Sequence, residues 1–322
     1  MLNPNRCVAF WPDMNKSSKS KPVLISVIII TAAVGWIAHR LWDGFDEVLA
    51  AISSLEPGFL LLSIVPAMIS VFIAAYLYFL VLARSVPKPP PLAHVMGHFI
   101  ISQVVRHLPG KIWGVFYQAN AMTKWVEARA TVQANIEHYA LMNYNSIAMA
   151  ISVFALFQYG TTVAMVIFSV ALLLLFVALR LSLLKRIVSI IIKITTRSKE
   201  SMDRSIENKH NLLIVALLQV DWFFYFLTCL IILPAYFSLK SAVIIGSCYA
   251  IAWLLGAMTI VMPGGLFVRE ASFLWVVGFF GFDPADMFIF SIVARTLFTL
   301  VDVICAVVSC SLIREQSGVL RA

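Results

Sequence analysis

The sequence predicts an all-α polytopic membrane protein with about six full spans and two hairpins that are broken at Pro-Gly. Hydrophobic residues make up 61% of the 322 residues and charged residues only 12%, with a mean hydropathy of +0.92. A soluble domain contains about 25% charged residues. Several apolar runs also approach or exceed the roughly 17–25 residues that cross a bilayer as a helix. Two further apolar regions contain a Pro-Gly break near their middle.

The expected full spans follow from these apolar runs. In chain order they are residues 23–39, 58–83, 132–158, 161–179, 212–233 and 287–313. The start of the chain resembles a secretory signal, but its apolar stretch is long and no A-x-A cleavage site follows it. We therefore expect a retained first span. Met14 opens the basic run "MNKSSKSKP", so the first thirteen residues are interpreted as an upstream extension with little structural role.

The basic residues predict how the chain is oriented. Lys and Arg cluster before the first span, after the second, between 124 and 129, between 180 and 210, and at the end of the chain. The connections at 43–47, 157–162, 234–241 and 281–286 are poorly basic. Cytoplasmic loops are enriched in Lys and Arg. We therefore expect one transmembrane domain over residues 23–313 in the inner (plasma) membrane. Its tails, 1–22 and 314–322, and its basic link, about 180–210, would be cytoplasmic.

This orientation requires residues 92–122 and 241–281 each to leave and return to the same side, as two passes or as a re-entrant hairpin. The first contains "ISQVVRHLPGKIWGVFYQAN" and the second "AMTIVMPGGLFVREASF". A broken helix in hydrocarbon leaves backbone N–H and C=O groups unpaired, which is tolerated only beside protein or a water-filled cavity. The breaks, Pro109–Gly110 and Pro263–Gly264–Gly265, are therefore expected at membrane depth, next to a hydrated cavity.

The two halves of the chain correspond to each other. Each has a span, a broken hairpin and a second span, and the first hairpin opens from the inside whereas the second opens from the outside. This pattern is typical of inverted-topology repeats whose site lies near the midplane. Residues 183–195 fit either an amphipathic helix on the anionic inner leaflet or an extension of the preceding span.

Ionisable residues away from the span ends are candidates for function, because a central charge costs roughly 2.5–3.5 kcal/mol on insertion scales. They are Arg106, His107, Lys111, Glu137, His138, Asp221, Arg269, Glu270, Arg295 and Asp302. Arg295 and Asp302 are seven residues apart, so they lie on one helix face.

These charges allow two interpretations. One is a structural ion-pair network that holds the helices together. The other is an anionic headgroup site formed by Arg106, Lys111, Arg269 and Arg295, because a guanidinium donates two parallel hydrogen bonds to phosphate. The helix limb after each Pro-Gly break would add its free N–H groups. Glu137, His138, Glu270 and Asp302 would then balance the charge or couple transport to protons.

Other chemistry is poorly supported by the sequence. His94 and His98 are i,i+4 but lack further ligands, and the five cysteines show no close CxxC spacing. No HExxH, GxSxG, Walker or GxGxxG motif is present. We therefore expect no metal site, no cofactor, no nucleic-acid partner and no enzyme activity.

One motif resembles a known family. The stretch "MPGGLFVREASF", followed by "DPAD" and "IVARTLFTLVD", resembles the closing motif of the lysylphosphatidylglycerol synthase transmembrane region, or flippase-like domain, family. That family shows Pro-Gly-Gly-x-Gly-x-Arg-Glu and then an Arg in the last span. The matching residues are Pro263, Gly264, Gly265, Arg269, Glu270 and Arg295. "HLPGKIWGVFYQAN" looks like its first Pro-Gly motif, and "IEHY" stands at its Glu-Arg pair.

Three departures from the family pattern concern lipid specificity. Phe267 replaces a glycine, Trp113 and Val115 flank Gly114 where the family more often has Gly-Glu, and His138 replaces an arginine. The resemblance implies a domain that in some members moves a lipid between leaflets and in others accompanies glycosyltransferases of envelope glycan assembly.

The leading hypothesis is a translocase for an anionic phospholipid or a polyprenyl-phosphate-linked glycan carrier, in cell-envelope lipid or polysaccharide assembly. The alternative is a non-catalytic scaffold that recruits a glycosyltransferase. A membrane-embedded transferase ranks third, because no set of nucleophile and base is visible. Lysyl transfer is not expected, since the soluble aminoacyl-transferase domain of some members is not part of the sequence.

Overall fold

A computed structural model describes residues 57–106, 113–181, 210–233, 238–258 and 268–319, and these residues contain helices and no strands. The helices of the first half are α3 (Pro57–Ala83), α4 (Leu92–Val105), α5 (Trp113–Ala121), α6 (Ala128–Tyr159) and α7 (Thr161–Arg180). Those of the second half are α9 (Asn211–Ile232), α10 (Leu239–Met258), α11 (Val268–Gly278) and α12 (Pro284–Val319). The all-α prediction is confirmed.

Six of the described helices are long and apolar enough to cross a membrane: α3, α6, α7, α9, α10 and α12. Five of them match predicted spans. The sixth, α10, is the first limb of the second predicted hairpin, and the predicted span at 23–39 lies outside the described residues. The chain is therefore a multi-pass membrane protein.

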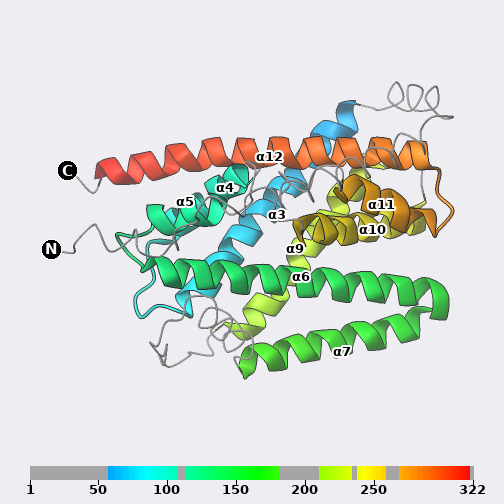
Figure 1. The fold of residues 1–322 in the computed structure, drawn as a ribbon, viewed down its shortest axis with the longest axis horizontal. Helices are drawn as coiled ribbons and strands as arrows, with labels where there is room; N and C mark the ends of the chain where they lie inside the picture. The colour runs from blue at the N-terminus through cyan, green and yellow to red at the C-terminus, as the bar shows by residue number, and fades with distance from the viewer. Residues whose placement is uncertain (1–56, 107–112, 182–209, 234–237, 259–267, 320–322) are drawn as a thin grey trace, which may run out of the picture.

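Both predicted hairpins form packed helix pairs, α4 with α5 and α10 with α11. They lie toward opposite ends of α12 (Figure 1). Each hairpin also packs on the long helix of the other half: α4 contacts α12, and α10 contacts α6. α3 and α9, the first described helices of the two halves, have the most extensive contact in the bundle. This exchanged packing is the arrangement expected of two inverted-topology repeats.

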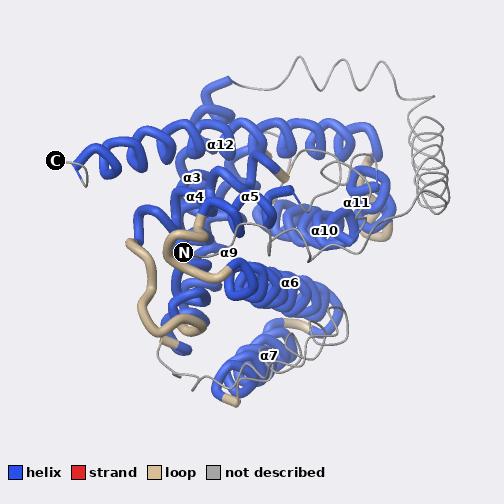
Figure 2. Tube along the Cα trace, turned by 60° about the vertical axis from the view of Figure 1, so that its left-hand side comes forward, coloured by secondary structure: helices blue, strands red, loops and turns tan. Residues whose placement is uncertain are grey.

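Local sequence sets the helix boundaries at two tight turns. Gly160 has a φ of +87°, a value that favours glycine, and it separates α6 from α7. The two helices therefore run antiparallel, as Figure 2 shows. α12 begins at Pro284, and the carboxylate of Asp283 accepts a hydrogen bond from the Asp286 N–H at 3.3 Å. Proline at the first helical position and an aspartate before it are typical helix-start residues.

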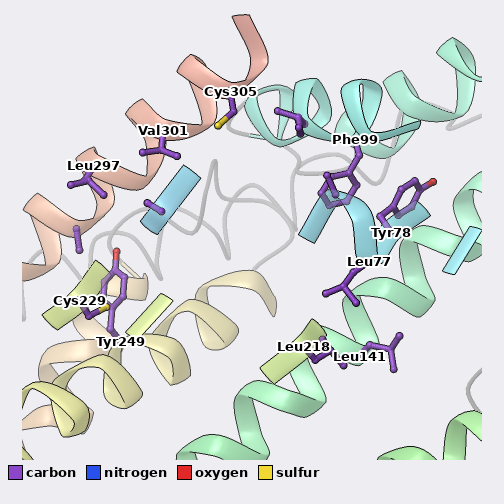
Figure 3. Close-up of a cluster of buried hydrophobic side chains, with 14 of the residues drawn as sticks. Leu77, Tyr78, Phe99, Leu141, Leu218, Cys229, Tyr249, Leu297, Val301 and Cys305 are labelled. Atoms are coloured by element: carbon purple, nitrogen blue, oxygen red, sulfur yellow. The ribbon is translucent and has the colours of Figure 1, made fainter. Parts of the chain in front are cut away.

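The core is made by aliphatic and aromatic side chains at the crossings of these helices. Tyr78 on α3 stacks on Phe99 on α4 with a centroid distance of 4.9 Å. Tyr249 on α10 lies beside Cys229 on α9, on the side of the core that faces α12 (Figure 3). α7 is far less buried and exposes Met165, Leu173 and other apolar side chains, as expected of a helix that faces lipid.

Candidate functional site

The first hairpin presents an arginine whose partners are all neutral. Arg106 ends α4, and its Nη2 donates to Asn135 Oδ1 on α6 at 3.3 Å. Its Nη1 donates to Gln103 Oε1 at 2.5 Å, and its guanidinium carbon lies 4.5 Å from the ring centroid of Tyr139. Among the described residues Arg106 has no carboxylate partner, so its positive charge is not neutralised by them.

A polar network fixes the position of this arginine. Asn135 is 1% exposed, and its Nδ2 contacts Gln118 Oε1 at 2.9 Å, the Thr131 carbonyl at 2.9 Å and the Tyr78 hydroxyl at 3.2 Å. These partners come from α3, α5 and α6. Buried polar networks restrict the geometry of their members, although Gln118 Nε2 and Arg106 Nε are buried here without a hydrogen bond to a described residue. The sequence analysis did not identify Asn135 or Gln118, although two amides in otherwise apolar helices are a usable signal.

The second hairpin carries two arginines that share one carboxylate. Arg295 Nη1 on α12 lies 2.6 Å from Glu270 Oε1, and Arg269 Nη2 lies 3.5 Å from the same oxygen. Arg269 and Glu270 are 7% and 5% exposed. Two guanidinium groups and one carboxylate leave one positive charge in excess. Arg269, Glu270 and Arg295 thus lie together in the structure, whereas the headgroup site predicted from Arg106, Lys111, Arg269 and Arg295 stays a prediction.

A glycine stands beside the arginine of each hairpin. A Cβ on Gly114 of α5 would lie 2.6 Å from the Ser102 carbonyl and 2.5 Å from Arg106 Cγ. A Cβ on Gly256 of α10 would lie 3.0 Å from Arg269 Cβ. Each hairpin therefore brings its limbs to close approach at the level of its arginine, which only glycine permits without a shift.

The remaining predicted carboxylate of α12 lies toward the first cluster. Asp302 is two turns beyond Arg295 and interacts electrostatically with Tyr139, the residue that packs under Arg106. α12 thus runs from the Arg269–Glu270–Arg295 cluster toward the Arg106 cluster.

Glu137 is held away from both arginine clusters. Its Oε1 lies 3.5 Å from Nη1 of Arg84, and both side chains are 1% exposed. Arg84 Nη2 also donates to the Leu179 carbonyl at 3.4 Å, at the end of α7. The sequence analysis counted Arg84 among the basic loop residues and missed this pair. A carboxylate such as Glu137 within an apolar helix requires a nearby cation, and this requirement could have identified Arg84 as its partner.

His138 lies between α3, α4 and α6. Its Nε2 donates to the Ala74 carbonyl at 3.2 Å, because a carbonyl only accepts, and its ring packs against Phe99 at 5.1 Å. It contacts neither Glu270 nor Asp302 in these interactions. Its assigned role in charge balance or proton coupling stays a prediction.

Asp221 is the other buried carboxylate of the sequence analysis. It is 4% exposed on α9 and accepts a hydrogen bond from Ser70 Oγ on α3 at 2.6 Å. No cation pairs with it among the described residues. At the contact between α3 and α9, the Ser70 hydroxyl therefore stabilises the Asp221 carboxylate in the place that a cation would ordinarily take.

Several predicted site residues lie outside the described residues. They are His107, Pro109, Gly110, Lys111, Pro263, Gly264 and Gly265. The predicted cavity between the two Pro-Gly breaks depends on them and stays a prediction. The flanks of the breaks are described: Arg106 precedes the first and Arg269 follows the second.

No group of three metal-ligating side chains occurs in the part of the chain that the structure describes. His94 and His98 stack at 6.4 Å, and His98 Nδ1 lies 3.0 Å from the Tyr117 hydroxyl. Anion binding by the arginines of the two hairpins stays a prediction, and its chemical basis is that a guanidinium donates charge-assisted hydrogen bonds to phosphate.

Comparison with models of protein families identifies the family of this chain. The model described as the lysylphosphatidylglycerol synthase TM region covers residues 23–306 of the chain. The matched segment contains every described helix except the last part of α12. No curated protein matches the chain.

Proposed function

The chain belongs to the lysylphosphatidylglycerol synthase TM region family, and from this premise we propose that it moves a lipid with an anionic headgroup between the two leaflets. The substrate class is an anionic phospholipid or a polyprenyl-phosphate-linked glycan carrier. Both present a phosphate to the protein and leave long apolar tails in the bilayer.

The observation that supports this proposal is that each hairpin cluster holds one more guanidinium group than the described carboxylates in direct contact with it. A buried guanidinium without a counter-charge is costly, so each excess calls for an anion or water. Arg106 is held by amides and an aromatic face, which leave its charge available. A headgroup phosphate would supply the missing negative charge and accept the charge-assisted hydrogen bonds.

Glu270 would act as the counter-charge of the empty site. Its Oε1 contacts both Arg269 and Arg295, whereas its Oε2 is buried and has no hydrogen-bond partner in the part of the chain that the structure describes. When a phosphate approaches, it would compete with this carboxylate for the two guanidinium groups. Asp302 and Glu137 would remain as the candidates for proton coupling, together with His138.

The proposed location is the inner (plasma) membrane with both termini in the cytoplasm, as the distribution of Lys and Arg favours. The proposed partners are membrane lipids and a glycosyltransferase or another envelope-assembly protein. In this proposal the protein has no catalytic activity and no cofactor.

The alternative is a scaffold that recruits a glycosyltransferase and moves no lipid. A reconstitution experiment separates the two. Purified protein is placed in liposomes with a fluorescent phosphatidylglycerol in both leaflets, and quenching from outside measures how fast the inner pool becomes accessible.

A translocase should accelerate this exchange for the anionic lipid well above protein-free liposomes, and an Arg269→Gln, Arg295→Gln double variant should lose the acceleration. A scaffold should leave the exchange at the background rate in every case. A second series with a labelled polyprenyl phosphate tests the other substrate class.

A further inference from the structure

A second polar site lies away from the hairpins, where the end of α7 meets the start of α9. A cavity of about 450 Å³ opens there. It is lined by Phe176, Arg180, His210, Asn211, Leu212 and Leu213. Figure 1 shows the two helix ends side by side, at the level where both spans end.

The start of α9 brings the first backbone N–H groups of this helix to the cavity. His210 precedes the helix with a φ of +70°, and its side chain makes no capping hydrogen bond. The first hydrogen bond of the helix runs from the Ile214 N–H to the His210 carbonyl at 2.9 Å. The N–H groups of Asn211, Leu212 and Leu213 therefore have no helical partner, and the positive end of the helix dipole points the same way.

Asn211 adds an independent observation. It is 4% exposed and lines the cavity, yet neither its Nδ2 nor its Oδ1 has a hydrogen-bond partner among the described residues. A buried amide without partners costs the desolvation of its polar atoms, and such groups are rare in native structures. An acceptor in the cavity would satisfy the Nδ2 donor.

Arg180 supplies a full positive charge to the same cavity. It lies in the last turn of α7, where a cation would ordinarily offset the negative end of the dipole. That role is already filled by Arg84, whose Nη2 contacts the Leu179 carbonyl at 3.4 Å. Arg180 forms no ion pair with a described residue, so its guanidinium is available to a ligand.

The remaining walls are apolar and continue into the lipid-facing surface. Leu212 is 72% exposed and Leu213 38% exposed, and Phe176 lies on α7 within its span. We propose that this cavity binds the phosphate of an anionic membrane phospholipid. The phosphate contacts the α9 N-terminus, Asn211 and Arg180, and one acyl chain lies against Phe176 and Leu212. This site is separate from the proposed translocation site and does not depend on it.

Photo-crosslinking tests the site in the purified full-length protein. The probes are a photoactivatable phosphatidylglycerol and the matching diacylglycerol, which lacks the phosphate, and the labelled residues are mapped by mass spectrometry. The phospholipid should label Phe176, Leu212 or Leu213 about five- to tenfold more than the diacylglycerol, the ratio expected from one charge-assisted contact at a half-exposed site. Because mass spectrometry identifies the labelled residues, crosslinks at the hairpins are distinguished from crosslinks at the cavity.

Two variants and a matched control sharpen the result. Asn211→Asp places a carboxylate in the first turn of α9, which favours the helix but repels phosphate. It should keep the fold and lose labelling here, as should Arg180→Gln. Arg129→Gln makes the same charge change at the start of α6, at a residue that does not line the cavity, and should label as the wild type does.

Equal labelling by the two probes, or unchanged labelling in Asn211→Asp, would overturn the proposal. Inorganic phosphate is added as a competitor at increasing concentration. If it protects the cavity while the two lipid probes label equally, the ligand is a free anion and the assignment to a lipid is wrong.

Discussion

The two hairpins hold their arginines in different ways. Arg106 of the first hairpin is surrounded by neutral donors, acceptors and aromatic rings, whereas Arg269 of the second shares Glu270 with Arg295. In both hairpins the guanidinium groups outnumber the described carboxylates in direct contact with them by one. The first can lose its arginine without stranding a carboxylate, and the second cannot. Equivalent positions in the two halves therefore differ in how strongly the charge is tied to folding.

The largest effect is expected when the shared carboxylate is removed. Glu270→Gln leaves two arginines without their counter-charge, and breaking a buried pair in this way costs about 3–5 kcal/mol. We expect a large fall in the unfolding temperature of the protein in detergent, measured by intrinsic fluorescence.

A second substitution should reverse much of that loss. In the Glu270→Gln, Arg295→Gln double variant Arg269 is the one arginine left in this cluster, so the unfolding temperature should recover toward that of the wild type. A double variant as unstable as Glu270→Gln alone would show that the ion pair does not account for the stability of this hairpin.

The close approach of the hairpin limbs predicts a graded series of glycine substitutions. Gly114→Ala puts a Cβ against the backbone oxygen of Ser102, which cannot yield, so a cost of about 1–3 kcal/mol is expected from overpacking. Gly256→Ala meets the Arg269 side chain at 3.0 Å and should cost less.

Gly278→Ala is the matched control, because nothing lies within 4 Å of its Cβ position. It should be neutral or slightly stabilising by helix propensity. Chemical denaturation of the three variants in mixed micelles measures the free energy of unfolding of each. If Gly278→Ala lowers this free energy as much as Gly114→Ala does, the packing explanation is wrong.

The sequence predicted most of the fold because its signals are strong. Length and hydropathy located α3, α6, α7, α9 and α12, and the Pro-Gly breaks located both hairpins. The pairing of charged residues could not be predicted from length and hydropathy, because it depends on how helices that are far apart in the sequence cross in the fold. From the sequence, Arg84 is expected to be a loop cation, whereas in the structure it pairs with Glu137 of α6. The Glu270–Arg295 grouping was predictable because the family motif joins the two residues.

The smallest effect is expected at Asp221. Asp221→Asn keeps the shape and removes a buried charge whose one partner among the described residues is Ser70, so stability should change by less than about 1 kcal/mol or rise. Ser70→Ala should be the more harmful change, because it takes the donor from a buried carboxylate, at a cost of about 1–3 kcal/mol. Thermal unfolding of the two variants side by side checks this order, and a larger loss in Asp221→Asn would show that the ionised carboxylate itself is needed.

Lipid exchange in liposomes that contain Arg106→Gln tests the central claim most directly. Arg106 has no carboxylate partner among the described residues, so Gln at this position should leave the protein folded, with a stability within about 1–2 kcal/mol of the wild type. If the excess charge at the hairpins binds the headgroup, Arg106→Gln should reduce the exchange of fluorescent phosphatidylglycerol at least tenfold, which corresponds to about 1.4 kcal/mol. Arg129→Gln in the same assay should keep the wild-type rate. Wild-type exchange by a folded Arg106→Gln protein would contradict the claim that this arginine holds the lipid phosphate.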